Sequence, residues 1–357
     1  MPKPIRVLFA PDYRDGGDYQ SLLADALAAV DVEVAFMSDY RRGLPLARGV
    51  RDFPADALHL HWPEKYFQRR RDGLDWLRKL RYPLDRALAT SRLPLFATAH
   101  NLLPHDRGDE FGVFTCVRDT MRSAHAVFTH SKAARAEVQT VFGLPDDRCV
   151  NVPHGDLAAG WPALLPRAQA RTALGLTDDK ALCLMFGTVS PYKGIAEVVR
   201  HFAARKSPAR LVVVGRAWDN HFARDLRDMA RESDAVDLRI AAEWLSRETL
   251  HCWLSAADVT LFNYRTILTS GAACLARSLG VPVVIPHRLS TVDLAEPHPL
   301  VFRFRSLEED FDEVLTHALS AQADYASAAE WRQTTSWHAI AETTAATYRA
   351  HLATKVH

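Results

Sequence analysis

The feature that most constrains this chain is a repeated alternation of short apolar runs with longer amphipathic stretches. Runs at 5–10, 95–100 and 181–186 are separated by stretches with the apolar spacing of helices, such as 195–204. Short apolar runs joined by helical segments are typical of parallel strands with crossover helices. We therefore predict an α/β protein built on doubly wound sheets. In such sheets, ligands bind beyond the carboxyl ends of the strands.

An irregular stretch at 156–169, which contains Gly160, Pro162 and Pro166, interrupts this alternation. A chain of 357 residues is long enough to bury two cores. We predict one Rossmann-like domain over residues 1–160 and a second over residues 165–330. A C-terminal helix at about 335–357 is expected to cross back to the first domain.

Composition excludes several classes of protein. The formal net charge of +1 argues against nucleic-acid binding, which normally needs a strongly basic domain. The cysteines are scattered without a CxxC pair, which favours reduced thiols in a cytoplasmic protein. No apolar run approaches the roughly 20 residues of a spanning helix, and the N-terminus has no signal-peptide pattern.

Two segments have the chemistry of a phosphate site. At 186–194, an apolar run ends in a turn of small residues that carries Lys193, and at 263–271 a polar turn opens a helix. Free backbone NH groups at a helix N-terminus, together with a nearby ammonium, suit an anion. The diphosphate-binding residues predicted from these turns are Gly187, Thr188, Lys193, Thr269, Ser270 and Gly271.

Histidines follow several of the apolar runs in the first half. These strand-end residues are His59, His61, His100, His130 and His154, and Asp12 follows the first run. A single histidine at a strand end is usually structural, but several at one sheet edge indicate a polar cleft. His100 is the preferred candidate because its strand leads directly into a polar loop bounded by Pro104. No helical HxxxH or HExxH spacing occurs, so a metal site is not favoured.

Two such domains with a returning helix resemble the GT-B glycosyltransferases, in which the domains face one another across a cleft. The turn at 187–194 is similar to the donor-site turn of family 4, where Lys193 matches the lysine that grips the diphosphate. Thr188 stands where that family has arginine. Residues 212–215 resemble the strand that lines the nucleotide, which places Gly215 and Arg216 beside it.

Further segments, at 12–23, 59–64 and 100–106, resemble a divergent branch of this superfamily found in bacterial polysaccharide, glycolipid and natural-product clusters. Most retaining members carry two glutamates across the donor loop. The matching positions here are Ile267 and Leu275. The resemblance is therefore to a branch that lacks the usual glutamate pair, and retention or inversion stays open.

The resemblance implies transfer of a hexosyl unit from a UDP- or GDP-linked sugar to a saccharide, glycolipid or natural-product acceptor. Neither metal nor another cofactor is expected, because Lys193 and the NH groups can stabilise the departing diphosphate. His100 would contact the donor sugar. If the reaction inverts, the candidate bases are, in order, Asp106, His105 and Asp12. The acceptor-side residues would be Gly16, Gly17, His61, Trp62 and Glu64.

The basic and aromatic stretch at 65–82 has two interpretations, which imply different acceptors. One interpretation is docking to anionic lipid at the inner membrane face. The other is a solvated helix face that Asp72, Asp75 and Asp85 neutralise. A lipid-linked and a soluble acceptor both remain in view.

Two other functions share this architecture. A nucleotide-sugar epimerase would need acid and base carboxylates in the cleft, which the sequence does not place. A non-catalytic nucleotide-sugar-binding protein would account for the lost glutamates and for Thr188. The presence of Lys193, Ser270 and the His100 loop favours an enzyme.

Overall fold

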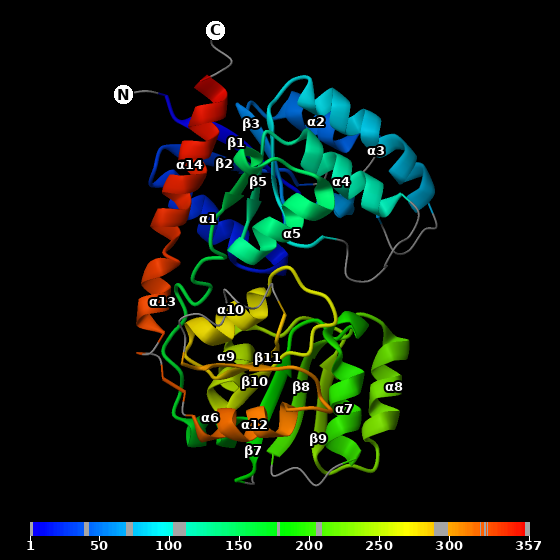
Figure 1. Cartoon of the computed structure of the whole chain (residues 1–357), viewed down its shortest axis with the longest axis vertical. Coiled ribbons are helices and arrows are strands. Elements are labelled where there is room, and N and C mark those ends of the chain that lie inside the picture. Colours follow the sequence, from blue (N-terminus) through cyan, green and yellow to red (C-terminus); the bar gives the residue numbers. More distant parts are fainter. Residues whose placement is uncertain are drawn as a thin grey trace. The chain divides into compact units, whose positions relative to one another are not determined.

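The protein forms two compact units, which the computed structural model describes over residues 3–38, 43–68, 74–102, 112–176, 179–204, 209–288, 299–321, 323–324, 326 and 328–353 (Figure 1). One unit comprises Met1–Gly155 and Thr335–His357, and the other comprises Asp156–Thr334. Each contains a six-stranded parallel sheet with helices. The predicted α/β class with two Rossmann-like sheets is confirmed.

The sheet of the first unit has the strand order β2-β1-β3-β4-β5-β6. Its strands are β1 (Ile5–Ala10), β2 (Val32–Phe36), β3 (Ala57–Leu60), β4 (Leu95–Thr98), β5 (Ala126–Thr129) and β6 (Cys149–Asn151). The strand order reverses at β1, which pairs in parallel with both β2 and β3. The carboxyl ends beside this reversal are where a doubly wound sheet offers a binding crevice.

Helices connect these strands. They are α1 (Tyr19–Ala28), α2 (Pro45–Asp52), α3 (Asp75–Thr90), α4 (Val113–Ser123) and α5 (Lys132–Phe142), with short 3-10 turns η1 (Arg14–Gly16), η2 (Pro63–Tyr66) and η3 (Asp146–Arg148). As the sequence predicts, Ser131 caps α5, since its hydroxyl accepts a hydrogen bond from the Ala134 NH at 2.9 Å. Gly143 ends the helix with a φ of 64°.

The last helix of the first unit is α14 (Trp337–Ala353), which packs beside α1. Its Tyr348 is fully buried, and the phenol lies 2.5 Å from Nδ1 of His59 on β3. The Tyr348 ring also meets the Phe96 ring edge-on, with centroids 4.8 Å apart. The C-terminal segment therefore completes the core of the N-terminal unit.

The sheet of the second unit has the order β12-β11-β10-β7-β8-β9. Its strands are β7 (Ala181–Phe186), β8 (Ala209–Arg216), β9 (Val236–Ala241), β10 (Val259–Leu261), β11 (Val283–Pro286) and β12 (Val301–Phe304). Its helices are α6 (Arg167–Ala173), η4 (Pro191–Lys193), α7 (Ile195–Ala204), α8 (Asn220–Ala230), α9 (Arg247–Ala256), α10 (Gly271–Ser278), α12 (Phe311–Ser320) and α13 (Ala329–Thr334). The order reverses at β7, between β10 and β8.

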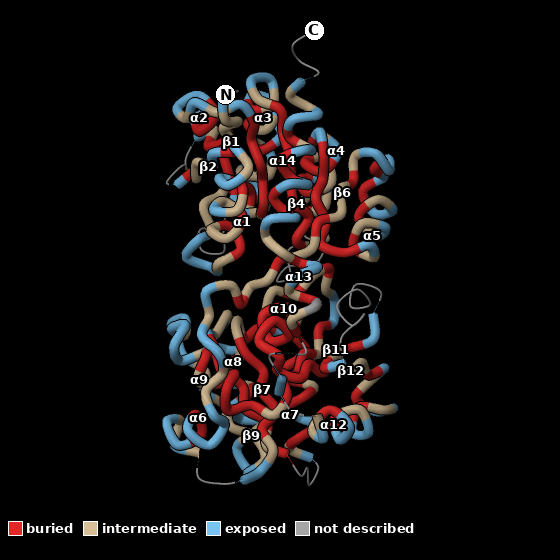
Figure 2. Tube along the Cα trace, turned by 90° about the vertical axis from the view of Figure 1, so that its left-hand side faces the viewer, coloured by how far each residue is buried: buried red, intermediate tan, exposed pale blue. Residues whose placement is uncertain are grey.

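The central strands of both sheets are buried, as Figure 2 shows, whereas edge strands such as β9 are partly exposed. In the second unit, side chains alternate between two apolar layers. Cys183 and Met185 of β7 join one layer, while Leu184 and Phe186 join the other. Helices cover both faces, which explains why the strands read as continuous apolar runs rather than as alternating ones.

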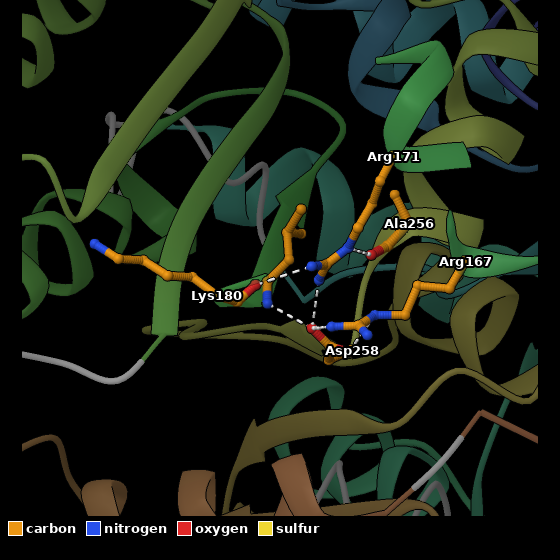
Figure 3. A network of polar contacts seen from close by, with 6 residues as sticks. Arg167, Arg171, Lys180, Ala256 and Asp258 are labelled. Carbon is orange, nitrogen blue, oxygen red and sulfur yellow. Dashed lines mark hydrogen bonds and ion pairs between the residues drawn. The ribbon is translucent and has the colours of Figure 1, made fainter. Parts of the chain in front are cut away.

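A charged network anchors β7 to its neighbours (Figure 3). Arg171 of α6 pairs with Asp258 at 2.8 Å, and it also donates to the carbonyl oxygens of Lys180 and Ala256. The Asp258 carboxylate accepts from the Leu182 NH at 2.6 Å. Asp258 therefore fixes the start of β10 against β7.

A break at Thr335 and Ser336 separates α13 from α14. The Ser336 hydroxyl accepts from the Ala339 NH at 3.3 Å, and its carbonyl accepts from the Ile340 NH. A serine that caps a new helix ends the previous one, because its side chain competes for backbone NH groups. None of the described helices is long and apolar enough to cross a membrane.

Candidate functional site

A tight turn follows β7 in the second unit. Gly187 has a φ of 94° and donates its NH to the Val214 carbonyl of β8 at 3.1 Å. Gly215 lies opposite, where a Cβ would stand 1.8 Å from the Gly187 carbonyl oxygen. Only glycine permits this approach of the two backbones. The turn after β7 and the end of β8 are therefore packed directly against each other.

Lys193 lies beneath this turn. Its side chain is buried, and Nζ donates to the Phe186 carbonyl at 3.0 Å. Burial desolvates the ammonium and lowers its pKa to about 8. A phosphate oxygen at this point would meet a cation that water solvates poorly, so the attraction would be stronger than in the open solvent.

A pocket is formed beside Lys193. Its polar lining includes Thr188 and Asn263, and its apolar lining includes Phe186 and Tyr264. Asn263 donates through Nδ2 to the Gly194 carbonyl at 3.1 Å, which joins the two predicted phosphate segments. The structure thus brings Gly187, Thr188 and Lys193 together in one place.

The second phosphate segment ends at the N-terminus of α10. The Ser270 hydroxyl accepts from the Ala273 NH at 3.1 Å and lies 2.7 Å from the Tyr264 hydroxyl. Ser270 therefore acts first as a helix cap. Thr269 and Gly271 flank it and are partly exposed, at the end of the helix where NH groups lack intrahelical partners.

Ile267 and Leu275, the two positions that the predicted resemblance matches to glutamates, are packing residues. Leu275 is 8% exposed within the apolar layer of α10, and Ile267 packs against the same layer. Neither position presents a polar group. Arg216, which follows Gly215, is exposed, and its guanidinium lies 5.4 Å from the centroid of the Trp244 ring.

The strand-end histidines of the first unit form a hydrogen-bonded chain. Nδ1 of His130 lies 3.2 Å from the Val152 carbonyl oxygen, and its Nε2 lies 3.3 Å from Nδ1 of His100. Nε2 of His100 in turn lies 3.3 Å from Nδ1 of His61. We call His61, His100 and His130 the histidine chain.

The direction of the histidine chain follows from its carbonyl end. Burial lowers the pKa of His130 to about 4 and holds those of His61 and His100 well below the usual range, so all three rings are neutral at pH 7. Because a carbonyl only accepts, His130 donates through Nδ1. The same alternation makes His100 and His61 donate through Nδ1. Nε2 of His61 is then an acceptor, and it has no hydrogen-bond partner among the described residues.

This arrangement bears on the predicted catalytic residues. Both ring nitrogens of His100 are engaged by histidines, so a sugar contact through nitrogen would require one of these bonds to be exchanged. Asp12 is paired with Arg14 at 2.8 Å, and this hydrogen bond lowers its pKa. His105 and Asp106 lie outside the described residues.

A second pocket lies at the carboxyl ends of β3 and β4. His61, Trp62 and Glu64 line it, together with His100 and Asn101. Trp62 stacks on His100 with ring centroids 4.1 Å apart and an interplanar angle of 9°. Although part of Glu64 remains exposed, the surrounding protein desolvates its carboxyl and raises the pKa to about 7.

The other predicted acceptor-side residues lie next to α1. Gly16 ends η1 and Gly17 follows it, and both are exposed. The Tyr13 ring, which stands next to Gly16, lies 4.6 Å from the Trp62 ring. The glycine turn is thereby connected to the pocket at β3.

Sequence reasoning missed three groups in these sites. Tyr19 meets the rings of four of the strand-end histidines and lies on α1, far from them in the sequence. Tyr348 reaches His59 from the last helix. Ser190 is fully buried in the turn that follows β7, and its hydroxyl has no partner among the described residues. Of these three residues, only Ser190 could have been found from the sequence, since it lies inside the segment 186–194. Within the described part of the chain, no group of three or more His, Cys, Asp or Glu side chains could hold a metal ion.

No family model matches this chain. The sequence is 28% identical over 249 residues to the GDP-mannose:glycolipid 4-beta-D-mannosyltransferase of Xanthomonas campestris pv. campestris. That alignment covers 68% of this chain and 64% of the relative. The chain therefore matches less than two thirds of the length of this curated relative.

Solved structures share the fold over nearly the whole chain. The Anabaena protein Alr3699/HepE in complex with UDP-glucose has a TM-score of 0.73 at 14% identity, covering 97% of this chain and 100% of that one. The sucrose-phosphate synthase of Thermosynechococcus elongatus has a TM-score of 0.69 at 16% identity, covering 98% and 100%. At these identities the likeness is one of fold, and the fold of this chain is GT-B.

Proposed function

We propose that the protein is a nucleotide-sugar-dependent glycosyltransferase that moves a hexosyl unit to a glycolipid or saccharide acceptor. The observation that carries the proposal is the buried ammonium of Lys193 beneath the β7 turn, in a chain of GT-B fold. Negative charge grows on the diphosphate as the glycosidic bond breaks. A fixed, poorly solvated cation stabilises that charge more in the transition state than in the ground state.

The donor site of this proposal comprises the residues around the β7 turn and the start of α10. Gly187, Thr188 and Lys193 would hold the diphosphate together with Thr269, Ser270 and Gly271. Gly215 and Arg216 would lie at the nucleoside. We propose that no metal or other cofactor is needed, since a cation and backbone NH groups can neutralise the leaving group.

We propose GDP-mannose as the first donor to test and UDP-glucose as the second. The X. campestris relative is named for GDP-mannose, and the Anabaena structure contains UDP-glucose. The relative is also named for a glycolipid acceptor and a β-linked product. Because the mannose of GDP-mannose is α-linked, a β-linked product requires inversion.

A thermal-shift screen with GDP, UDP, ADP, TDP and CMP tests the donor site. A ligand at a hundred times its dissociation constant stabilises a protein by about 2.7 kcal/mol. We expect GDP or UDP to raise the melting temperature and Lys193→Met to abolish the rise. Lys180→Met, at an exposed position of the same unit, is the matched control. An equal shift in the Lys193 variant would contradict the donor site.

We also propose that α3 of the first unit docks on an anionic membrane surface. Its outer face carries exposed apolar side chains, with Trp76 62%, Leu80 74% and Leu84 57% exposed. Lys79 lies on the same helix and is partly exposed. A helix with an exposed apolar face and a nearby cation suits the headgroup region of anionic lipid.

The carboxylates of α3 do not neutralise this face. Asp75 is buried and paired with Arg78 at 2.8 Å. Asp85 is buried and accepts from the backbone NH groups of Leu46 and Ala47 at the start of α2. The solvated-face interpretation therefore loses two of its three neutralising residues, and Asp72 lies outside the described residues. We propose a peripheral protein on the cytoplasmic face of the membrane.

Sedimentation with vesicles of phosphatidylcholine and phosphatidylglycerol tests the docking. We expect the wild type to sediment at low salt and less at moderate salt, and the Leu80→Glu, Leu84→Glu double variant to remain in the supernatant. Val141→Glu, at an exposed apolar position of α5, should behave as the wild type. Absence of sedimentation at low salt would remove the membrane proposal without touching the donor site.

A further inference from the structure

The pocket at the ends of β3 and β4 combines one carboxyl group with neutral surroundings. Its polar lining is Glu64, His61, His100 and Asn101, and α4 contributes Val117 and Met121. The pocket lies beside the reversal of strand order at β1, where a doubly wound sheet binds its ligands. An alcohol that entered here would meet few groups able to take its proton.

Glu64 is free to act as a base. No hydrogen bond or ion pair joins its carboxyl to another side chain in the described part of the chain. This contrasts with Asp12, whose carboxylate is held by Arg14. Desolvation raises its pKa to about 7, against the opposing effects of a hydrogen bond from its own backbone NH and of neighbouring Lys65. A base with a pKa near the working pH is both ionised and strong enough to keep the proton that it takes.

The histidines of the pocket are poorly suited to the same task. The pKa values of His61 and His100 are held well below the ordinary value by burial, so neither ring would keep a second proton at neutral pH. His100 also has both nitrogens engaged. Nε2 of His61 is oriented as an acceptor, which suits a hydrogen bond from a second hydroxyl of a sugar rather than proton removal.

We propose that Glu64 is the general base that takes the proton of the attacking acceptor hydroxyl, an inference that rests on the proposed glycosyl transfer. The acceptor oxygen gives an electron pair to the anomeric carbon as its proton passes to the Glu64 carboxylate. The bond from that carbon to the diphosphate breaks, and its electrons leave with the nucleoside diphosphate. Attack opposite to the leaving group inverts the anomeric centre.

The isosteric change Glu64→Gln tests the assignment. With GDP-mannose as donor and long-chain alkyl glycosides as acceptors, we expect kcat to fall by about 10²- to 10⁴-fold, the usual contribution of a general base. Binding of GDP, measured by thermal shift, should be unchanged. Glu64→Asp should retain more activity than Glu64→Gln. Glu137→Gln on α5 is the matched control, because burial also raises the pKa of Glu137 but that residue does not line the pocket.

The pH profile separates a base from a structural carboxylate. The titratable groups that face Glu64 are His61 and His100 from the ends of β3 and β4 and the neighbouring Lys65, while α4 presents Val117 and Met121 to the pocket. We expect kcat/KM of the wild type to fall tenfold per unit as the pH drops below about 7, and the residual rate of Glu64→Gln to lack this fall.

The outcomes are distinguishable. Transfer by Glu64→Gln within threefold of the wild type, or an unchanged acid limb in that variant, would overturn the role of Glu64 and leave the glycosyltransferase proposal standing. A wild type that binds no nucleotide and transfers to no acceptor would overturn both.

Discussion

Single residues with altered chemistry mark both sites of this protein. Burial lowers the pKa of Lys193 and raises that of Glu64, so each titrates near neutral pH. A lysine and a glutamate on the protein surface would both be fully charged at neutral pH. A cation that titrates near neutral pH therefore lies at the β7 turn, and a carboxyl that titrates near neutral pH lies at the β3 pocket.

We expect Lys193 to make the proposed nucleotide binding depend on pH. The ammonium form binds phosphate, and the pKa of the free protein is about 8. As the pH rises through 8, Lys193 loses its proton and the affinity for GDP should fall by about tenfold per unit. Calorimetric titration with GDP at pH 7 and pH 9 measures this change. Lys193→Met should bind weakly at both values, whereas an affinity in the wild type that is constant with pH would contradict the role of the lysine.

Sequence reasoning could place these residues but not their environment. Lys193 and Glu64 stand in short motifs at the ends of apolar runs, so their positions at strand ends follow from the pattern alone. The orientation of the histidine chain could not be predicted, because it depends on the Val152 carbonyl, which lies beyond a different strand. Tyr19 and Tyr348 were missed for the same reason, since they reach the histidines through tertiary packing.

At the scale of elements, predictability depends on how local the signal is. The bounds of β7, α7 and α9 agree with their apolar patterns, because strands covered on both faces and amphipathic helices leave clear periods. β12 was not predicted, since Val301–Phe304 includes Arg303 and is too short to show a period. The break before α14 depends on one capping serine within an otherwise helical composition.

The carboxyl edge of the first sheet should make the protein sensitive to acid. The buried histidines have pKa values below 6.5 when folded, about 3 for His59 and about 4 for His130. Between these values and 6.5 the unfolded chain binds more protons, so stability is lost as the pH falls below 6.5. Each such histidine contributes up to about 1.4 kcal/mol per pH unit.

Chemical unfolding followed between pH 7 and pH 5 measures this loss. We expect His154→Gln to lessen the slope, because the pKa of His154 is also held well below its usual range by burial. His338→Gln, at an exposed position on α14, should leave the slope unchanged. A slope that is the same in all three proteins would show that His154 binds protons equally in the folded and the unfolded chain, so that burial does not lower its pKa.

At the scale of the whole molecule, the chain leaves its first unit at Gly155 and returns to it at Thr335. The second unit is continuous between these points. The first unit is not, since Tyr348 and the other buried residues of α14 fill its core. Sequence motifs indicate each sheet separately. The return of the last helix is also predicted from the sequence, but the residues that it buries against α1 are seen only in the structure.

Removal of residues 337–357 should therefore destabilise the N-terminal unit selectively. The deletion takes away Tyr348, Ala341 and Ala345, which are fully buried, and opens a cavity along α1. Loss of one large buried side chain costs about 3–5 kcal/mol, so loss of the helix should unfold the unit. Hydrogen exchange should rise throughout residues 5–151 while the peptides of 181–286 remain protected. Uniform exchange in both units would contradict this division.

The returning helix also bears on how the protein is made. A ribosome releases residues 156–334 before it releases α14, so the continuous second unit can close its core while the N-terminal unit still lacks its last helix. Domains normally complete their folding in the order of synthesis. In this protein we expect the opposite order, because the first sheet lacks the helix that fills its core until α14 has been synthesised.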